Sequence, residues 1–506
     1  MTFSASILPV FEQLGLLEEA CKLSLPFKGL QIYSMDMKLM GDFDFRKYKE
    51  KTGYDTILFA RPEMHHLLLS KIPPNKILIK KKILSQLQNE HGVMIRCADN
   101  TTYHGDILVG ADGAYSAVRQ CLYKQAEKAG VLPKCDTESL NVGHVCMVGV
   151  TDPLDPEKYP ALKDDVSHFE RIIGAGTTHS WATSTVPGNR VCWLLTDQLD
   201  SSTASKEAMF KNSEWGPEAN ASMIRAYYDY QAPIGGTMGE IIDATPAELI
   251  SKVFLEEKLF ETWHYGRTVL IGDACHKFLP SGGQGAVNAM QDAVILANCL
   301  YDISDPTPEN ILTAFKSYRS QRYDQTKYQM DKCRKIAKMI WGQTIGDKIF
   351  RHVAFHCIPK AIQTRMIFKD TSYRPQVMFL PRIPNRGTVD VLPQIPYIQP
   401  LVPHPLKVSK VTFTSFDDRA FAIKMCYMCF SYGNYTESQE DKQTLESASH
   451  GDTSLTTAPS VEPVDNAQVA RVSMAREIYR FNPKPVLIKV KRMQYSSMAK
   501  ELELTP

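Results

Sequence analysis

Four glycines, a proline and an aspartate fall within one short stretch of the chain, VLIGDACHKFLPSGGQGAVNAMQDA. The apolar run Val269–Ile271 predicts a buried strand, which ends at Gly272 and Asp273. Gly283 and Gly285 then lead into a helical pattern. Glycine lets a ligand approach the backbone closely, and the first N–H groups of a helix attract anionic oxygens. The stretch therefore suits a ligand with both hydroxyl and anionic groups, although a packed turn without a ligand has the same local pattern.

A second stretch repeats the apolar strand that ends in glycine and aspartate. Ile107–Val109 is followed by GADGAYSAVR, which contains Asp112, Gly113 and Arg119. Ligands of open parallel sheets bind beyond the carboxyl ends of the strands, so two such ends predict one shared site. Asp112 and Arg119 either belong to that site or form an ion pair that stabilises the turn.

Antiparallel strands are predicted between the two glycine-rich turns. HSWATSTVPGNRVCWLLTDQ predicts a hairpin that turns at residues 187–189, and LNVGHVCMVGVT predicts a strand beside it. Before the Asp112 turn, a run of strands is predicted with a turn at residues 99–100. Trp181, Trp193 and the run YYDY either pack this sheet or line a pocket.

Helical patterns flank the strands. Residues 9–24 predict one helix, and the segment after Gly285 predicts a helix with one buried face, marked by Val287, Met290, Val294 and Ala297. Glu309–Trp341 continues as helix. The segment 335–369 mixes apolar and basic residues, so it either covers a core or lies on a membrane surface. Residues 485–492, PVLIKVKR, predict a stray strand or a binding segment.

Composition excludes several classes of protein. The 506 residues carry a net charge of +2, and no basic cluster is interleaved with aromatic residues, so we expect no nucleic-acid partner. Twelve scattered cysteines indicate reduced thiols. Cys426-x-x-Cys429 is a single pair with no second pair at zinc-finger spacing, so no metal is expected. We interpret the histidine pair His65-His66 as helix surface. We expect an intracellular protein, cytoplasmic or bound peripherally to a membrane.

Three motifs in this order resemble the FAD-dependent aromatic hydroxylases, the single-component flavin monooxygenases with the para-hydroxybenzoate hydroxylase fold. They are FARPEMHHLLL, GADGAYSAVR and GDACHKFLPSGGQG. A further segment, YRPQVMFLPRIPNRGTV, is similar to the carboxyl-terminal flank of fungal members. The resemblance covers residues 3–390.

The resemblance implies a role for each matching residue. Asp273 would bind the ribityl hydroxyls of FAD, and Pro280 would lie near the isoalloxazine ring. The N–H groups of Gly285 and Ala286 would stabilise the negative charge of the reduced flavin. The complete set implied to bind the cofactors, FAD and the reductant NAD(P)H, is Arg61, Asp112, Gly113, Arg119, Gly272, Asp273, Pro280, Gly283, Gly285 and Ala286. No catalytic residue is assigned.

Three departures separate this chain from the family pattern. Cys275 stands where the family usually has alanine, and Val287 stands where it often has asparagine, with Asn288 one position later. The third departure is the opening strand–GxGxxG–helix unit, which nothing in the sequence matches. We therefore expect an N-terminally incomplete FAD-binding sheet, with an unpaired apolar edge between Ile107–Val109 and Val269–Ile271.

These expectations combine into an α/β protein with a Rossmann-like FAD-binding domain and an inserted, mostly antiparallel substrate-domain sheet. A helical C-terminal part and a disordered tail follow. The expected divisions are 1–125 and 263–345 for FAD binding, 126–262 for the substrate domain, 346–431 for a helical and proline-rich extension, 432–475 for a disordered linker, and 476–506 for a short final segment.

The activity that the resemblance implies is that of an FAD-dependent monooxygenase, an oxidoreductase of secondary metabolism. It would use NAD(P)H and O2 to hydroxylate or epoxidise a small organic molecule. Two alternatives stay open. The chain is a truncated, non-catalytic member or an incomplete gene model that binds FAD poorly, or it is a flavin reductase or dehydrogenase that does not oxygenate.

Overall fold

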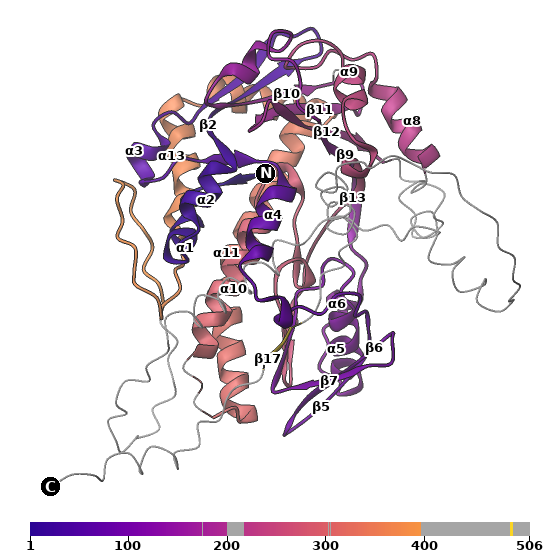
Figure 1. Ribbon diagram of the computed structural model, residues 1–506, viewed down its shortest axis with the longest axis vertical. Helices are drawn as coiled ribbons and strands as arrows, with labels where there is room; N and C mark the ends of the chain where they lie inside the picture. The colour runs from indigo at the N-terminus through magenta and orange to yellow at the C-terminus, as the bar shows by residue number, and fades with distance from the viewer. Residues whose placement is uncertain (175, 200–216, 302, 304, 396–485, 489–506) are drawn as a thin grey trace, which may run out of the picture.

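A computed structural model of the chain describes residues 1–174, 176–199, 217–301, 303, 305–395 and 486–488. The fold is α/β, as predicted. A large antiparallel-rich sheet lies at one end of the molecule and a small three-stranded sheet at the other, with two long helices between them (Figure 1). The pair Cys426 and Cys429 and the predicted disordered linker 432–475 lie outside the described residues.

The two strands that end in glycine and aspartate lie side by side. β8 (Ile107–Gly110) and β15 (Thr268–Leu270) pair in parallel, and the Ile271 N–H donates to the Gly110 carbonyl at 3.0 Å. β14 (His264–Tyr265) pairs with β15, and β17 (Val486–Ile488) pairs antiparallel with β8. The expected unpaired edge between the two strands is therefore wrong, because their backbones satisfy each other directly. Of the segment 485–492, predicted as a stray strand or a binding segment, the described residues Val486–Ile488 form a strand on the outer edge of β8.

The large sheet has the order β1-β4-β2-β10-β11-β12-β9-β13-β16, with β3 paired to β2. Only β2 and β10 pair in parallel, so the predicted antiparallel character is confirmed. The strands are β1 Thr2–Phe3, β2 Ser24–Ser34, β3 Leu39–Asp44, β4 Ile57–Phe59, β9 Asn141–Val150, β10 Ser167–Ile173, β11 Ser180–Val186, β12 Arg190–Gln198, β13 Ser251–Leu259 and β16 His276–Lys277.

Both predicted strand turns are present. β11 and β12 form a hairpin through residues 187–189, where Gly188 and Asn189 have φ of +81° and +55°. The small sheet contains β5 (Ile83–Asn89), β6 (Gly92–Cys97) and β7 (Thr102–Gly105). Asn100, with φ of +61°, lies in the predicted turn between β6 and β7. Glycine and asparagine tolerate the left-handed region that such turns require.

The N-terminal helical region departs from the prediction. It contains two short helices, α1 (Leu8–Gln13) and α2 (Leu17–Lys22), rather than one. Gly15 adopts φ of +71°, which interrupts the helix, and Ser24 already begins β2. The other short helices are α3 Tyr48–Thr52, α4 Arg61–Ser70, α5 Ala117–Lys128, α6 Lys134–Thr137, α8 Pro217–Tyr227 and α9 Met238–Asp243.

Two long helices connect the ends of the molecule. α10 (Gly285–Tyr301) is buried at every residue from Val287 to Cys299. The prediction of one buried face therefore underestimated the extent of its burial. α11 (Pro308–Trp341) confirms the predicted long helix. α10, α11, β8 and β15 share one hydrophobic core. After α11 come α12 (Ile345–His352), a π-helical turn (Val353–Cys357) and α13 (Lys360–Lys369).

A second core lies on the antiparallel sheet. Trp181, Trp193 and Tyr227 are buried in it, and the Trp181 ring stacks on Tyr230 with ring centroids 4.6 Å apart. The indole N–H of Trp181 donates to the Gln231 carbonyl at 2.9 Å. These aromatic residues therefore pack the sheet, which decides between the two interpretations of the sequence. Among the described helices, none combines the length and apolar character needed to cross a bilayer.

Candidate functional site

Arg119 joins the two glycine-rich turns. From α5 its guanidinium donates to the Ala274 carbonyl at 3.0 Å and to the Ala114 carbonyl. Its Cζ lies 4.2 Å from the ring centroid of Phe260. The described hydrogen bonds of Asp112 go to Ser116 and Val118, and the positive charge of Arg119 also favours the ionised form of Asp112. Through its hydrogen bonds, Arg119 holds the carboxyl ends of β8 and β15 at one edge.

Asp112 caps the helix that follows its own turn. One carboxylate oxygen accepts from the Ser116 hydroxyl and the other accepts from the Val118 N–H at 3.0 Å. Ser116 in turn accepts from the backbone N–H of Arg119 at 2.8 Å. Burial raises the pKa of Asp112, although these hydrogen bonds oppose that shift. Both oxygens thus serve the start of α5.

Asp273 has a different environment at the end of β15. It lies in the short 3-10 helix η5 (Gly272–Ala274), is buried, and forms an ion pair with Lys277, whose Nζ is 2.5 Å from Oδ2. Lys277 belongs to β16, which pairs with β13 of the large sheet. The Asp273 carboxylate therefore lies where the sheet of β8 and β15 meets the antiparallel sheet.

Glu256 of β13 adds a second acid to this region. It is buried and accepts a hydrogen bond from the hydroxyl of Tyr115, which follows the Asp112 turn. Burial raises the pKa of Glu256, while Tyr115 and Lys277 oppose the shift. Carboxylates and a lysine are thus gathered between the two turns.

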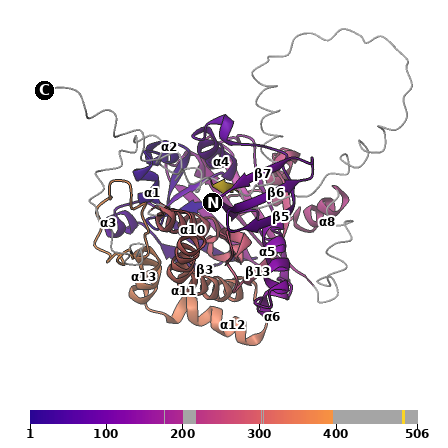
Figure 2. The same ribbon diagram turned by 90° about the horizontal axis from the view of Figure 1, so that it is seen from below.

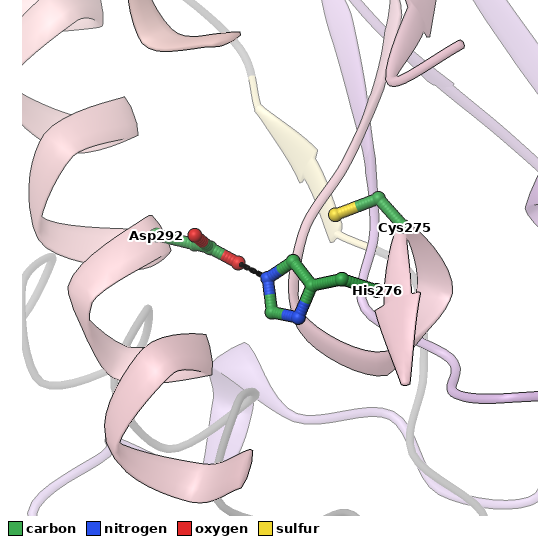
Figure 3. A group of neighbouring side chains, drawn as sticks. All are labelled: Cys275, His276 and Asp292. Atoms are coloured by element: carbon green, nitrogen blue, oxygen red, sulfur yellow. Dashed lines mark hydrogen bonds and ion pairs between the residues drawn. The ribbon is translucent and has the colours of Figure 1, made fainter. Parts of the chain in front are cut away.

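Asp292 of α10 braces the Gly272 turn from below. Its Oδ2 accepts from the Gly272 N–H at 2.8 Å and lies 2.5 Å from His276 Nε2, and its Oδ1 accepts from Arg322 Nε at 2.7 Å. Figure 3 shows His276 and Asp292 directed at each other, with Cys275 beside them. The His276, Asp292 and Arg322 side chains are completely buried.

Charge balance makes this group a structural brace. Burial alone would raise the pKa of Asp292, but His276 and Arg322 outweigh it and lower the pKa below its ordinary value. Cys275, His276 and Asp292 lie close enough to share a metal ion. The arginine already neutralises the carboxylate, however, and a buried cation beside a metal ion would repel it.

The loop between β16 and α10 brings bare backbone to the same edge. Ser281, in the 3-10 helix η6 (Pro280–Gly282), donates to the Cys333 carbonyl of α11 at 2.7 Å, which fixes the loop. A Cβ added at Gly285 would meet nothing within 4 Å. The N-terminus of α10, with Gly285 and Ala286 in its first turn, therefore faces open space.

Gly272 is required for the close packing of its turn on α10. Its φ is +59°, and an added Cβ would lie 3.0 Å from the Cβ of Ala289. A side chain at this position would strain the backbone and push the turn from the helix. Gly113 has φ of +88° in the equivalent turn after β8.

Arg61 lies at the start of a helix that follows a strand beside the glycine loop. It begins α4, directly after β4 and Ala60, and β4 pairs with β1. A Cβ added at Gly283 would lie 3.5 Å from the Thr2 hydroxyl of β1, so this strand pair borders the glycine loop. The prediction that His65 lies on the helix surface is wrong: His65 is buried, and burial together with Arg61 lowers its pKa to about 4.

Asn288 faces away from the open side of the loop. Its Nδ2 donates to the Gln284 carbonyl at 3.0 Å, and its Oδ1 accepts from Arg322 at 3.0 Å. The amide is thus part of the buried brace. Many family members have asparagine where this chain has Val287. Because the asparagine of this chain is one position later, its amide does not lie on the cofactor side.

Sequence reasoning missed four residues of the site: Lys277, Glu256, Asp292 and Arg322. Two carried a signal. Lys277 follows Asp273 by four residues, and Asp292 is an acid inside the apolar run AMQDAVILA. Glu256 and Arg322 gave no local signal, because their partners are distant in the chain.

The arrangement fits a large ligand with hydroxyl and anionic groups. Asp273 and Lys277 supply charge-assisted hydrogen bonds, and the start of α10 supplies N–H donors and a positive dipole end. The FAD molecule carries both kinds of group. The residues present therefore suit its ribityl chain and its flavin ring edge.

Comparison with known proteins also indicates an FAD site. The FAD binding domain family model matches residues 203–329, which include η5, the glycine loop and α10. One fungal relative is the FAD-dependent monooxygenase nvfK of Aspergillus novofumigatus, which is 27% identical over 401 residues and covers 76% of this chain and 78% of that protein. Another is the FAD-dependent monooxygenase ptmM of Penicillium ochrochloron, which is 29% identical over 334 residues and covers 63% of this chain and 75% of that protein.

Solved structures show the same fold. HpxO of Klebsiella pneumoniae, complexed with FAD and uric acid, superposes with a TM-score of 0.58 at 19% identity, covering 74% of this chain and 88% of that one. A salicylate hydroxylase in a substrate complex superposes with a TM-score of 0.53 at 17% identity, covering 72% and 89%. At these identities the likeness establishes the architecture and leaves substrate choice open.

Proposed function

We propose that this chain is an FAD-dependent monooxygenase that uses NAD(P)H and O2 to hydroxylate or epoxidise a small organic molecule. Its relation to fungal FAD-dependent monooxygenases and the match to the FAD binding domain model support the proposal. The observation that carries it is the edge where β8 and β15 end, with a buried aspartate opposite an exposed helix start.

Different residues of this edge bind different parts of the cofactor. Asp273 binds the ribityl hydroxyls, with Lys277 as its counter-ion in the absence of a ligand. The first N–H groups of α10, at Gly285 and Ala286, stabilise negative charge on the flavin ring, beside Pro280. Arg61 binds FAD from α4.

The Gly113 turn serves the pyrophosphate and the approach of NAD(P)H, but through its backbone. Asp112 and Arg119 are engaged in capping α5 and in joining the turns, so both act here by positioning. FAD, when bound, supplies the redox step that links NAD(P)H oxidation to O2. One oxygen atom then enters the substrate, and the other leaves as water.

Within the antiparallel sheet, the strands from β9 to β13 belong to the substrate domain, for which we assign residues 126–262. We assign residues 1–125 and 263–345 to FAD binding, and these segments add β1–β4 and β16 to the same sheet. The pairing of β16, which follows the Asp273 turn, with β13 supports a substrate domain beside the cofactor. The twelve cysteines are scattered along the chain, which is typical of thiols in a reducing compartment, so we place the enzyme inside the cell.

The test begins with FAD itself. Purified protein is titrated with FAD, and the dissociation constant is read from quenching of flavin fluorescence. Oxidation of NADPH and NADH is then followed with a panel of small organic molecules under 18O2. One 18O atom per product molecule is expected. NAD(P)H oxidation without labelled product would identify a flavin reductase, and no FAD binding would identify a non-catalytic chain.

A further inference from the structure

The segment after α11 exposes a cluster of large apolar side chains. Of the 21 large hydrophobic residues exposed in the described part of the chain, six fall between Ile345 and Met366. We call these six the α12–α13 patch: Ile345, Ile349, Phe350, Val353, Ile362 and Met366. Ile345 is 78% exposed and Ile349 is 60% exposed, whereas Ile340, one residue before the end of α11, is 4% exposed. The amphipathic segment therefore covers the core near its start and again at Ile367 and Phe368, and it leaves the six side chains of the patch exposed.

Helical spacing aligns these side chains on the outer face. Ile345, Ile349 and Val353 are four residues apart, as are Ile362 and Met366. The opposite face is attached to the protein, because Arg351 donates to the carbonyls of Met339 and Gly342 at 2.6 and 2.7 Å. Figure 2 shows α12 at the outer margin of the molecule.

The π-helical turn is anchored to the large sheet. The Phe355 ring lies 6.0 Å from the ring of Phe43 on β3, measured between centroids, and packs within 3.3 Å of the Cβ position of Gly41. The patch is thus a fixed surface with a defined outward face, rather than a loose helix.

Basic residues border the patch. Lys348, Lys360, Arg365 and Lys369 are exposed. The two acids of the segment are engaged locally: Asp347 closes a capping box with Thr344, and Asp370 pairs with Lys332. Lys360 also interacts with Asp44 of β3, whose pKa it helps to lower, and Lys369 lies over the Tyr328 ring. Lys348 and Arg365 form no ion pair among the described residues, so the border carries a positive charge.

We propose that the α12–α13 patch docks on an anionic membrane surface. The apolar side chains enter the boundary between headgroups and acyl chains, and the basic side chains contact lipid phosphates. A second copy of the chain is a poorer occupant, because symmetric contact would bring the same cations together. The contact is peripheral, since no described helix can span a bilayer.

The test uses flotation of the full chain with two kinds of vesicle, phosphatidylcholine alone and phosphatidylcholine with phosphatidylserine. Binding to the anionic vesicles is expected at low salt and should weaken as salt increases. Ile345→Glu with Ile349→Glu should weaken it by more than about tenfold. Substituting Lys348, Lys360 and Arg365 by glutamine should weaken it by about fivefold for each side chain.

A matched control is Leu87→Glu, because Leu87 is 63% exposed on β5 in the small sheet. This variant should float like the wild type, and all variants should melt at the same temperature as the wild type. The proposal is overturned if the wild type binds neither vesicle or if the double isoleucine variant still floats. A dimer in sedimentation that the double variant abolishes, without vesicle binding, would assign the patch to a second copy.

Discussion

The two turns after β8 and β15 are alike in sequence and opposite in use. Each follows a buried apolar strand and contains a glycine with positive φ and an aspartate. Asp112 directs both oxygens to the helix that follows it, so its turn is self-contained. In the described part of the chain, the Asp273 carboxylate accepts from Lys277, while a different acid, Asp292, fixes the backbone of its turn.

The difference shows how a turn can keep a carboxylate for a ligand. In the first turn, Asp112 itself accepts a backbone N–H, whereas in the second turn Asp292 of α10 accepts the backbone N–H of Gly272. Asp273 is thereby released from capping. The comparison predicts that these three aspartates have separable roles in stability and cofactor binding.

The largest effect is expected for Asp292→Ala. Removing this carboxylate leaves the Arg322 charge buried without compensation and the Gly272 N–H without its acceptor. The loss in the free energy of unfolding should be about 3–5 kcal/mol, measured by urea denaturation. A loss below about 1 kcal/mol, comparable to that of a surface substitution, would contradict the role of Asp292 as the brace.

Asp273→Ala should weaken FAD binding while leaving stability nearly unchanged. Loss of charge-assisted hydrogen bonds of about 1.5–3 kcal/mol each corresponds to a ten- to hundredfold increase in the dissociation constant. Fluorescence titration with FAD gives this constant, and thermal melting checks the fold. Asp112→Asn is the matched control, since it removes a charge from the equivalent turn. Equal FAD content of wild type and Asp273→Ala after desalting would refute the assignment.

A smaller effect separates two substitutions of Asp112. Asp112→Ala removes the acceptor of the Val118 N–H in the first turn of α5, where Ser116 is the N-cap residue, and should cost about 1 kcal/mol of unfolding free energy. Asp112→Asn keeps a side-chain acceptor and should cost less, because an amide oxygen can still accept this hydrogen bond. Urea denaturation of both variants at neutral pH makes the comparison. Equal losses would mean that the charge of Asp112 matters more than its hydrogen bonds.

The smallest effect is the pH dependence of the same two turns. The folded pKa of Asp112 is raised, so its native state holds more protons above 3.8, and this contribution to stability grows as pH falls through that window. The folded pKa of Asp292 is lowered, so its contribution is lost below 3.8. The amount by which the melting temperature of the wild type exceeds that of Asp112→Asn should therefore increase from pH 7 to pH 4. A constant difference would show that Asp112 does not titrate in this range.

Local chemistry decided much of the fold. Gly188 and Asn189 take the positive φ that a tight hairpin needs, so that turn was predictable from residue type. The long helix α11 was predictable from its periodicity. The break at Gly15 was missed, because the apolar periodicity continues past this glycine. The strand that begins at Ser24 was missed for the same reason.

The sequence by itself determined the strand ends and the glycine turns, because each depends on neighbours a few positions away. Tertiary structure alone decided which aspartate caps its own turn and which does not. Asp292 reaches Gly272 across 20 positions and Arg322 across 30. It also decided that β17, from far along the chain, lies on β8, and that the α12–α13 patch faces outward. Periodicity states that a helix has an apolar face, but burial of that face depends on what the rest of the chain places against it.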